Sequence, residues 1–339
     1  MMLDEKRLDA LLRSGSLEEL MQQLHDTPYA SLIPLYDQTG DVQRMEAELF
    51  RRQVLLHKEI AEYLDGNHAE LILALTRKLE VENLKSVLRL WFSSTFKHQN
   101  IDYRFGYLYQ DGIVSSIDWH QLINASNYQE VLETLKDTPY GEAASSFDPE
   151  EFVSDGIFYL ETALDRCWFH ELRRYVDKMP RRDRLLLSAV FDNDCDLKNV
   201  INLVRFGYMY RIPTERLRSL MLDGGTVNGS KEFEEYLACE PEDRSVVSLV
   251  RRRFPKLAKE LAEQRKGSMA TSQQTIRIEK YLSELRKKEY MSMLAGYPFT
   301  IGIVLVYFFL CERQDKMIRA LINGKYYGWD AQTIRGFAI

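Results

Sequence analysis

The sequence has 339 residues, of which 45% are hydrophobic and 28% are charged. This balance is typical of a folded globular protein and argues against an intrinsically disordered chain. The net charge of −6 gives no reason to expect nucleic acid as the main partner, and four scattered cysteines without a CxxC pair argue against a zinc site or a disulfide framework. We therefore expect a reducing, cytoplasmic setting.

A thirteen-residue segment occurs twice. Leu17 to Tyr29 reads LEELMQQLHDTPY, and Tyr128 to Tyr140 reads YQEVLETLKDTPY, with six identical positions at an offset of 111 residues. Apolar residues in each copy follow the period of an α-helix. The proline of the shared Asp-Thr-Pro-Tyr end then stops the helix, because proline disfavours helical geometry in the preceding residue and lacks an N–H donor. We predict a short helix that ends at each copy.

A second repeat lies further along the chain. Leu79 to Arg89 (LEVENLKSVLR) matches Cys195 to Arg205 (CDLKNVINLVR) at an offset of 116 residues. Both copies have an acid, an Asn three residues later and apolar residues at helical spacing. A weaker third copy near the C-terminus has Met317 in place of the Asn. The repeat-motif positions that we single out as structural are Glu80, Asn83, Asp196, Asn199, Glu312 and Arg319.

Longer amphipathic patterns lie between these motifs. They predict one long helix in each repeat, over 42–63, 151–178 and 275–293. Only 103–114 shows an alternation that suits a strand. We predict an all-α protein made of three related helical units, over residues 1–115, 116–211 and 212–339.

The linkers of the second and third copies also match. Pro213 and Asp330 are each expected to start a short helix, with Leu217 and Ile334 as the apolar members. The glycine-rich loop over 223–230 and the stretch over 267–274 are the expected joints.

An apolar run near the C-terminus has the length of a membrane span. From Leu294 to Cys311 no charge occurs for 18 residues. Gly296 and Pro298 interrupt its start, and the fourteen residues from Pro298 rise only about 21 Å, short of the roughly 30 Å hydrocarbon core. The run then continues into a polar helical sequence. We interpret it as a buried helix from Pro298 onward.

The sequence contains no recognisable pattern of catalytic residues. The six histidines are isolated, and the sequence has no phosphate-binding loop or serine and cysteine nucleophile signature. The basic runs over 181–184 and 251–253 have acidic neighbours and are interpreted as solvated helix faces. Asp192, Asp194 and Asp196 could hold Mg²⁺, as in an all-α transferase. The alternative, which we favour, is that these acids cap a helix start.

The order and spacing of these motifs resemble the C subunit of the V-type (archaeal and bacterial) ATPases, which is equivalent to the d subunit of the eukaryotic enzyme. The third unit contributes Gly296-Tyr297-Pro298-Phe299, Glu312, the run from Ile318 to Lys325 and the pair Ile334-Arg335. The resemblance covers essentially the whole chain. It implies three helical units with pseudo-threefold symmetry that form a funnel.

The resemblance also implies a function. A protein of this kind is a non-catalytic part of the central stalk and couples rotation of the shaft to the membrane rotor ring during ion transport. The implied partners are the proteolipid ring and the D and F subunits of the shaft, and the implied location is cytoplasmic, peripheral to the membrane. No cofactor, nucleic acid or small-molecule substrate is expected. A general helical scaffold and the Mg²⁺-dependent transferase remain as alternatives.

Overall fold

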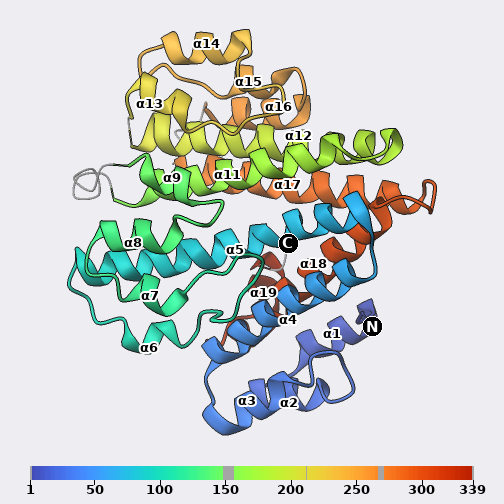
Figure 1. Ribbon diagram of the computed structural model, residues 1–339. Helices are drawn as coiled ribbons and strands as arrows, with labels where there is room; N and C mark the ends of the chain where they lie inside the picture. Colours follow the sequence, from blue (N-terminus) through green and yellow to red (C-terminus); the bar gives the residue numbers. More distant parts are fainter. Residues whose placement is uncertain (1, 148–155, 211, 266–270, 338–339) are drawn as a thin grey trace. The chain divides into compact units, whose positions relative to one another are not determined.

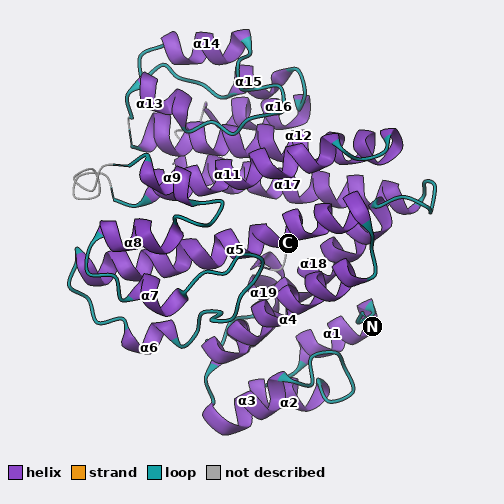
Figure 2. Ribbon diagram, viewed as in Figure 1, coloured by secondary structure: helices purple, strands orange, loops and turns teal. Residues whose placement is uncertain are grey.

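The computed structural model describes residues 2–147, 156–210, 212–265 and 271–337, which contain helices and no β-strand (Figure 2). The all-α prediction is confirmed. The alternating stretch over 103–114 forms the end of a short helix followed by turns, so its one strand-like pattern does not produce a strand.

The chain forms two compact units (Figure 1). Unit 1 comprises Met1–Thr134 and Ile303–Ile339, and unit 2 comprises Leu135–Gly302. The helices of unit 1, of which the last residue of α8 and the first of α18 cross the boundary, are α1 Glu5–Arg13, α2 Leu17–Gln23, α3 Leu32–Thr39, α4 Val42–Glu62, α5 Gly66–Thr95, α6 Asp102–Phe105, α7 Trp119–Ile123, α8 Tyr128–Leu135, α18 Gly302–Tyr326 and α19 Ala331–Phe337.

Unit 2 contains two long helices that are joined by a tight turn, and a third that follows later in the chain. Its helices are α9 Gly141–Ser145, α11 Phe158–Asp177, α12 Arg181–Asn202, the π-helical segment η1 Leu203–Met209, α13 Thr214–Ser219, α14 Lys231–Ala238, α15 Val247–Arg251, α16 Pro255–Arg265 and α17 Thr271–Leu294. The predicted long helices correspond to α4, α11 and α17. The beginning of the second one, over 151–155, lies outside the described residues.

The two Asp-Thr-Pro-Tyr motifs end their helices in the same way. The Thr27 hydroxyl donates to the carbonyl oxygen of Leu24 at 2.7 Å and accepts from the Tyr29 N–H at 3.1 Å. The corresponding distances around Thr138 are 2.6 and 3.2 Å. Tyr29 and Tyr140 are both buried. The predicted helix stops are confirmed, and the threonine side chain closes the turn that proline begins.

The two ends of the chain share one hydrophobic core in unit 1. Buried residues of α1 to α4 pack together with Ile318, Leu321 and Ile322 of α18 and with Ile334 of α19. Unit 2 has its own core, built from α12, η1 and α13 to α17. The division of the chain into three repeat units at residues 115 and 211 stays a prediction.

The short helices after the second and third copies form as predicted. α13 follows Pro213 and α19 follows Asp330, and their apolar residues Leu217 and Ile334 are fully buried. Ile334 lies so close to Gly324 that a Cβ at this glycine would overlap its side chain. The glycine therefore allows α19 to pack directly on α18.

The apolar run near the C-terminus does not start a helix at Pro298. α18 begins at Gly302, and residues Ala295 to Phe299 are exposed in the connection between α17 and α18. Within the described parts of the chain, no helix combines the length and the apolar character that a membrane crossing needs. The expected helix is therefore shorter at its start, since Gly296 and Pro298 favour a turn.

Candidate functional site

Two buried carboxylates hold the loops that follow the long helices α5 and α12. Glu80 accepts hydrogen bonds from the backbone N–H groups of Val114 and Ser115 at 2.7 and 2.6 Å. Asp196 accepts from those of Thr226 and Val227 at 2.6 and 2.8 Å. Both side chains are fully buried. Each acid therefore fixes two successive residues of a loop that lies about thirty residues away along the chain.

An asparagine one helical turn later fixes a second point of the same loop. Asn83 donates to the carbonyl oxygen of Tyr109 at 2.9 Å and accepts from the N–H of the same residue at 3.2 Å. Asn199 makes the same pair of bonds with Leu222, at 3.1 and 2.7 Å. A side-chain amide suits this position because it offers one donor and one acceptor to a single backbone residue. We call each acid–asparagine pair a loop anchor.

The anchors lie in the middle of their helices. α12 begins at Arg181, eleven residues before Asp192, so the interpretation of the aspartates as caps of a helix start is wrong. Asp196 does satisfy backbone donors, but these belong to the glycine-rich loop. Gly224 and Gly225 have φ of +117° and +68°, and a side chain at Gly225 would overlap the Asp196 carboxylate. Successive N–H groups in such a turn form an anion-binding concavity, which Asp196 occupies.

The glycine-rich loop over 223–230 does not have the character of a free joint. Its backbone is held by Asp196, and its last residue, Ser230, caps α14. The second expected joint begins with residues 267–270, which lie outside the described residues, and α17 occupies the rest of it.

The third copy holds the N-terminal segment instead of a following loop. The Gln314 amide donates to the carbonyl oxygen of Leu3 at 3.1 Å. Eleven residues later, the Lys325 ammonium donates to those of Leu12 and Ser14 at 2.9 and 2.5 Å. Gln314 and Lys325 therefore tie the start of the chain to α18.

The first copy has a counterpart of the lysine contact. Trp91, eleven residues after Glu80, donates its indole N–H to the carbonyl oxygen of Ala125 at 2.8 Å. Ala125 is 111 residues after Ser14, which is the offset of the thirteen-residue repeat. The N-terminal segment is thus held by α18 in the same way as residues 114–125 are held by α5.

The two remaining predicted positions lie elsewhere on α18. Glu312 pairs with Lys316 on the same helix at 3.0 Å. The Arg319 Nε is buried and finds no acceptor among the described residues. Burial raises the pKa of Asp315, and the charge of Arg319 partly opposes this rise. Neither side chain makes the contacts to the N-terminal segment, which fall to Gln314 and Lys325.

Each aspartate of the acidic cluster has its own arginine. Asp192 contacts Arg173, and Asp196 accepts from Arg253 at 2.9 Å. Asp194 receives two parallel bonds from Arg286, at 2.7 and 2.6 Å. Among the described residues, no three His, Cys, Asp or Glu side chains are placed to share a metal ion. The three carboxylates are thus used separately, which disfavours the Mg²⁺ site of a transferase.

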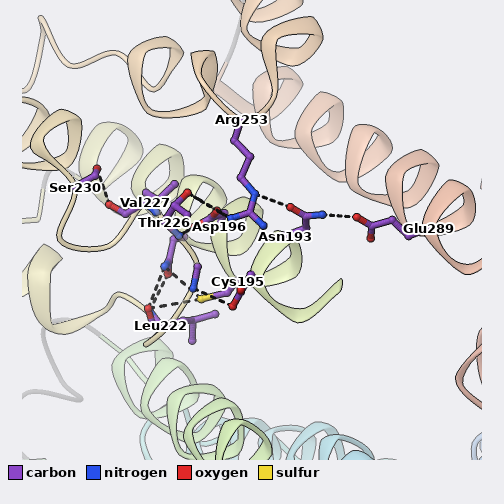
Figure 3. Close-up of polar contacts among 12 residues, drawn as sticks. Asn193, Cys195, Asp196, Leu222, Thr226, Val227, Ser230, Arg253 and Glu289 are labelled. Carbon is purple, nitrogen blue, oxygen red and sulfur yellow. Dashed lines mark hydrogen bonds and ion pairs between the residues drawn. The ribbon is translucent and has the colours of Figure 1, made fainter. Parts of the chain in front are cut away.

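Arg253 is the centre of a polar network that joins three segments of unit 2 (Figure 3). Its Nε donates to the Asn193 side chain at 2.7 Å, and Asn193 in turn contacts Glu289 of α17. Burial raises the pKa of Glu289 to about 7, opposed by the hydrogen bond from Asn193. The interpretation of the basic run over 251–253 as a solvated helix face is wrong for Arg253, whose head group lies against Asp196.

A model of the ATP synthase (C/AC39) subunit family matches residues 1–337. The chain belongs to this family. The match covers both units and every loop anchor, and it confirms the resemblance that the order of the sequence motifs indicates.

Proteins named as the C subunit of the A-type ATP synthase are similar to this member of the family. The one from Methanosarcina mazei is 24% identical over 291 residues, which cover 86% of this chain and 75% of the relative. The Haloferax volcanii protein is 25% identical and covers 96% and 89% of the two chains. The Methanocaldococcus jannaschii protein is 20% identical and covers 99% and 82%.

The arginine partners of the aspartates in this ATP synthase family member do not follow from the sequence. Arg173, Arg253 and Arg286 lie 19, 57 and 92 residues from the aspartates that they contact. No local spacing links residues so far apart. The sequence offers a weaker signal. Three acids on alternate residues of one helix point in different directions, so cations have to approach from several sides to pair with each of them.

Proposed function

We propose that this chain is a non-catalytic component of the central stalk that couples rotation of the central shaft to the membrane rotor ring during ion transport. In this proposal the three repeat units form a funnel-shaped body between the D and F subunits of the shaft and the proteolipid ring, on the cytoplasmic face of the membrane. Membership of the ATP synthase (C/AC39) family supports the assignment to the complex.

The loop anchors are the observation that supports a role in transmitting torque. A coupling part has to rotate as one body, because any elastic or local unfolding motion within it loses work between shaft and ring. Glu80, Asn83, Asp196 and Asn199 tie loops to the centre of long helices by buried hydrogen bonds. Such satisfied polar networks restrict local opening.

Removal and return of the chain test the proposal directly. Complexes that lack the chain should still hydrolyse ATP in the head but should not transport ions, and addition of the purified chain should restore transport. A tagged chain should also recover the proteolipid and the shaft proteins from detergent-solubilised membranes, with one copy of itself. Ion transport that persists without the chain would contradict coupling. Recovery of the chain without other ATPase components would favour the general scaffold.

The Asp196 anchor gives a sharper version of this test. A complex assembled with the Asp196→Asn variant should transport fewer ions per ATP hydrolysed than the native complex. Asp223→Asn is the matched control, since Asp223 lies on the same loop and its side chain is 57% exposed. If the two variants transport the same number of ions per ATP hydrolysed, the Asp196 anchor has no role in transmitting torque.

A further inference from the structure

One end of unit 2 exposes a group of large apolar side chains. They come from the start of α12 and from the end of α17 with the connection that follows it, and we call them the tip surface: Leu185, Met291, Leu294, Tyr297 and Phe299. Phe299 is 82% exposed and Leu185 is 63% exposed. Exposed large apolar side chains that gather at one end of a unit in this way point to a site of interaction.

Two contacts bring the segments of the tip surface together. The backbone N–H of Ile301 donates to the Asp183 carboxylate at 3.1 Å. The guanidinium of Arg182 lies 3.9 Å from the centre of the Tyr297 ring. The start of α12 and the connection after α17 therefore form one surface, at the edge of unit 2 where both segments are drawn in Figure 1.

The border of the tip surface is strongly basic, although the chain as a whole has a net charge of −6. Five exposed cations lie next to the apolar residues: Arg181, Arg182, Arg184, Lys287 and Lys288. Glu284, one turn before Lys288 on α17, is exposed, and the other acids beside the cations are engaged. Asp183 is buried against Ile301, Asp194 is paired with Arg286, Asp177 is paired with Arg173, and Glu289 contacts Asn193. The five exposed cations therefore outnumber the exposed acids without a cation partner, and the net exposed charge of this region is positive.

The tip surface combines apolar and basic side chains, and this combination indicates which kind of partner binds there. An acidic protein surface would match the five cations but would leave exposed Phe299 and Leu185 in water. An apolar protein groove would cover the aromatic and aliphatic side chains but would not need the charges. The interface of a bilayer offers both, since anionic headgroups attract Lys and Arg while the boundary below them accepts Tyr, Phe and Leu.

We propose that the tip surface docks on a lipid bilayer that contains anionic headgroups. Phe299, Tyr297 and Leu294 enter the headgroup region, and the basic residues contact lipid phosphates. The proposal goes beyond rotary coupling and does not depend on it, because lipid alone is the partner.

Co-sedimentation of the full chain with vesicles tests the proposal. The chain should bind vesicles that contain phosphatidylglycerol at low salt, should bind more weakly at high salt because ions screen the attraction, and should not bind pure phosphatidylcholine vesicles. The double variant Lys287→Gln, Lys288→Gln should lose on the order of tenfold in affinity. Lys231→Gln with Lys259→Gln is the charge-matched control and should bind like the native chain.

The apolar contribution needs its own pair of variants. Phe299→Ser should bind phosphatidylglycerol vesicles several-fold more weakly, whereas Ile276→Ser, which changes an exposed residue at the opposite end of α17, should not. All of these side chains are exposed, so circular dichroism should show unchanged folding. Absence of binding to anionic vesicles overturns the proposal, and so does equal binding by all variants. Binding only to vesicles that carry the rotor proteolipid would also overturn the proposal, because the partner of the tip surface would then be a protein and not lipid.

Discussion

The long helices α12 and α18 each hold a neighbouring segment, but they use opposite chemistry. α12 presents Asp196, which accepts from backbone N–H groups, whereas α18 presents Lys325, which donates to backbone carbonyl groups. The reason lies in the segment that is held. The glycine-rich turn after α12 directs N–H groups inward, while the end of α1 leaves carbonyl groups without helical partners. The backbone groups that the held segment presents therefore determine whether an anionic or a cationic side chain binds them.

The largest effect on stability is expected from a change of the Asp196 carboxylate. Asp196→Asn should lower the free energy of unfolding by about 3 kcal/mol or more, because it leaves Arg253 without its anion and weakens the bonds to Thr226 and Val227. Urea unfolding followed by circular dichroism measures this loss. The exposed Asp223 provides the control, and Asp223→Asn should change stability by less than about 0.5 kcal/mol. Similar losses for the two variants would contradict the role of the anchor.

The residue at the asparagine position can be exchanged between the second repeat copy, which has Asn199, and the third copy, which has Met317. Asn199→Met introduces the residue of the third copy and should cost about 2 kcal/mol, because it leaves the buried N–H of Leu222 without an acceptor. The Leu222 carbonyl loses one donor but still accepts from Asn228. The reverse change, Met317→Asn, should not stabilise the chain, since the N-terminal segment is already held by Gln314 and Lys325. A gain in stability for Met317→Asn would show that the third copy retains an anchor of the first kind.

The contact between Lys325 and the N-terminal segment should contribute less to stability than either loop anchor. Lys325→Met should lower the free energy of unfolding by roughly 1 kcal/mol and should mainly loosen the N-terminal segment. Amide hydrogen exchange in α1 should accelerate, while exchange in α14 should stay unchanged. Lys316→Met is the control because Lys316 is exposed and pairs with Glu312 on its own helix. Unchanged exchange in α1 would mean that the apolar core alone holds this segment.

The smallest effect is expected from pH at the network around Arg253. Because the pKa of Glu289 is raised to about 7, the folded chain binds more protons than the unfolded chain between about pH 4.5 and 7. Glu289 should therefore cost stability as pH rises through this window. Because Glu289 is only half-buried and water screens its charge, Glu289→Gln should be more stable than the native chain by at most about 1 kcal/mol at pH 8, and equal to it below pH 4.5. Thermal unfolding of the two proteins across this pH range measures the difference, and Glu284→Gln, a change at an exposed glutamate of the same helix, is the matched control.

Much of the fold follows from local patterns. The Asp-Thr-Pro-Tyr motifs mark the ends of α2 and α8, and the period of apolar residues marks the long helices. The start of α18 differs from the prediction because Pro298 can begin a helix or sit in a turn, and only packing decides between them. The tip surface is likewise hidden in the sequence, since an uncharged run is equally compatible with a buried core.

The candidate site is only partly predictable. The pairs Glu80–Asn83 and Asp196–Asn199 are visible as a repeat, so their importance follows from the sequence. Their function as loop anchors does not, because the groups that they bind lie 23 to 35 residues away.

The sequence by itself determined that this protein is helical, that it repeats, and where its short helices stop, because these properties depend on residues within one or two turns of each other. Only the tertiary structure decided which backbone groups meet Asp196, that Arg253 pairs with this carboxylate, and that the N-terminal segment is held by α18. Those contacts depend on chain segments that are brought together by burial of a shared core, and no local rule encodes the distance between them.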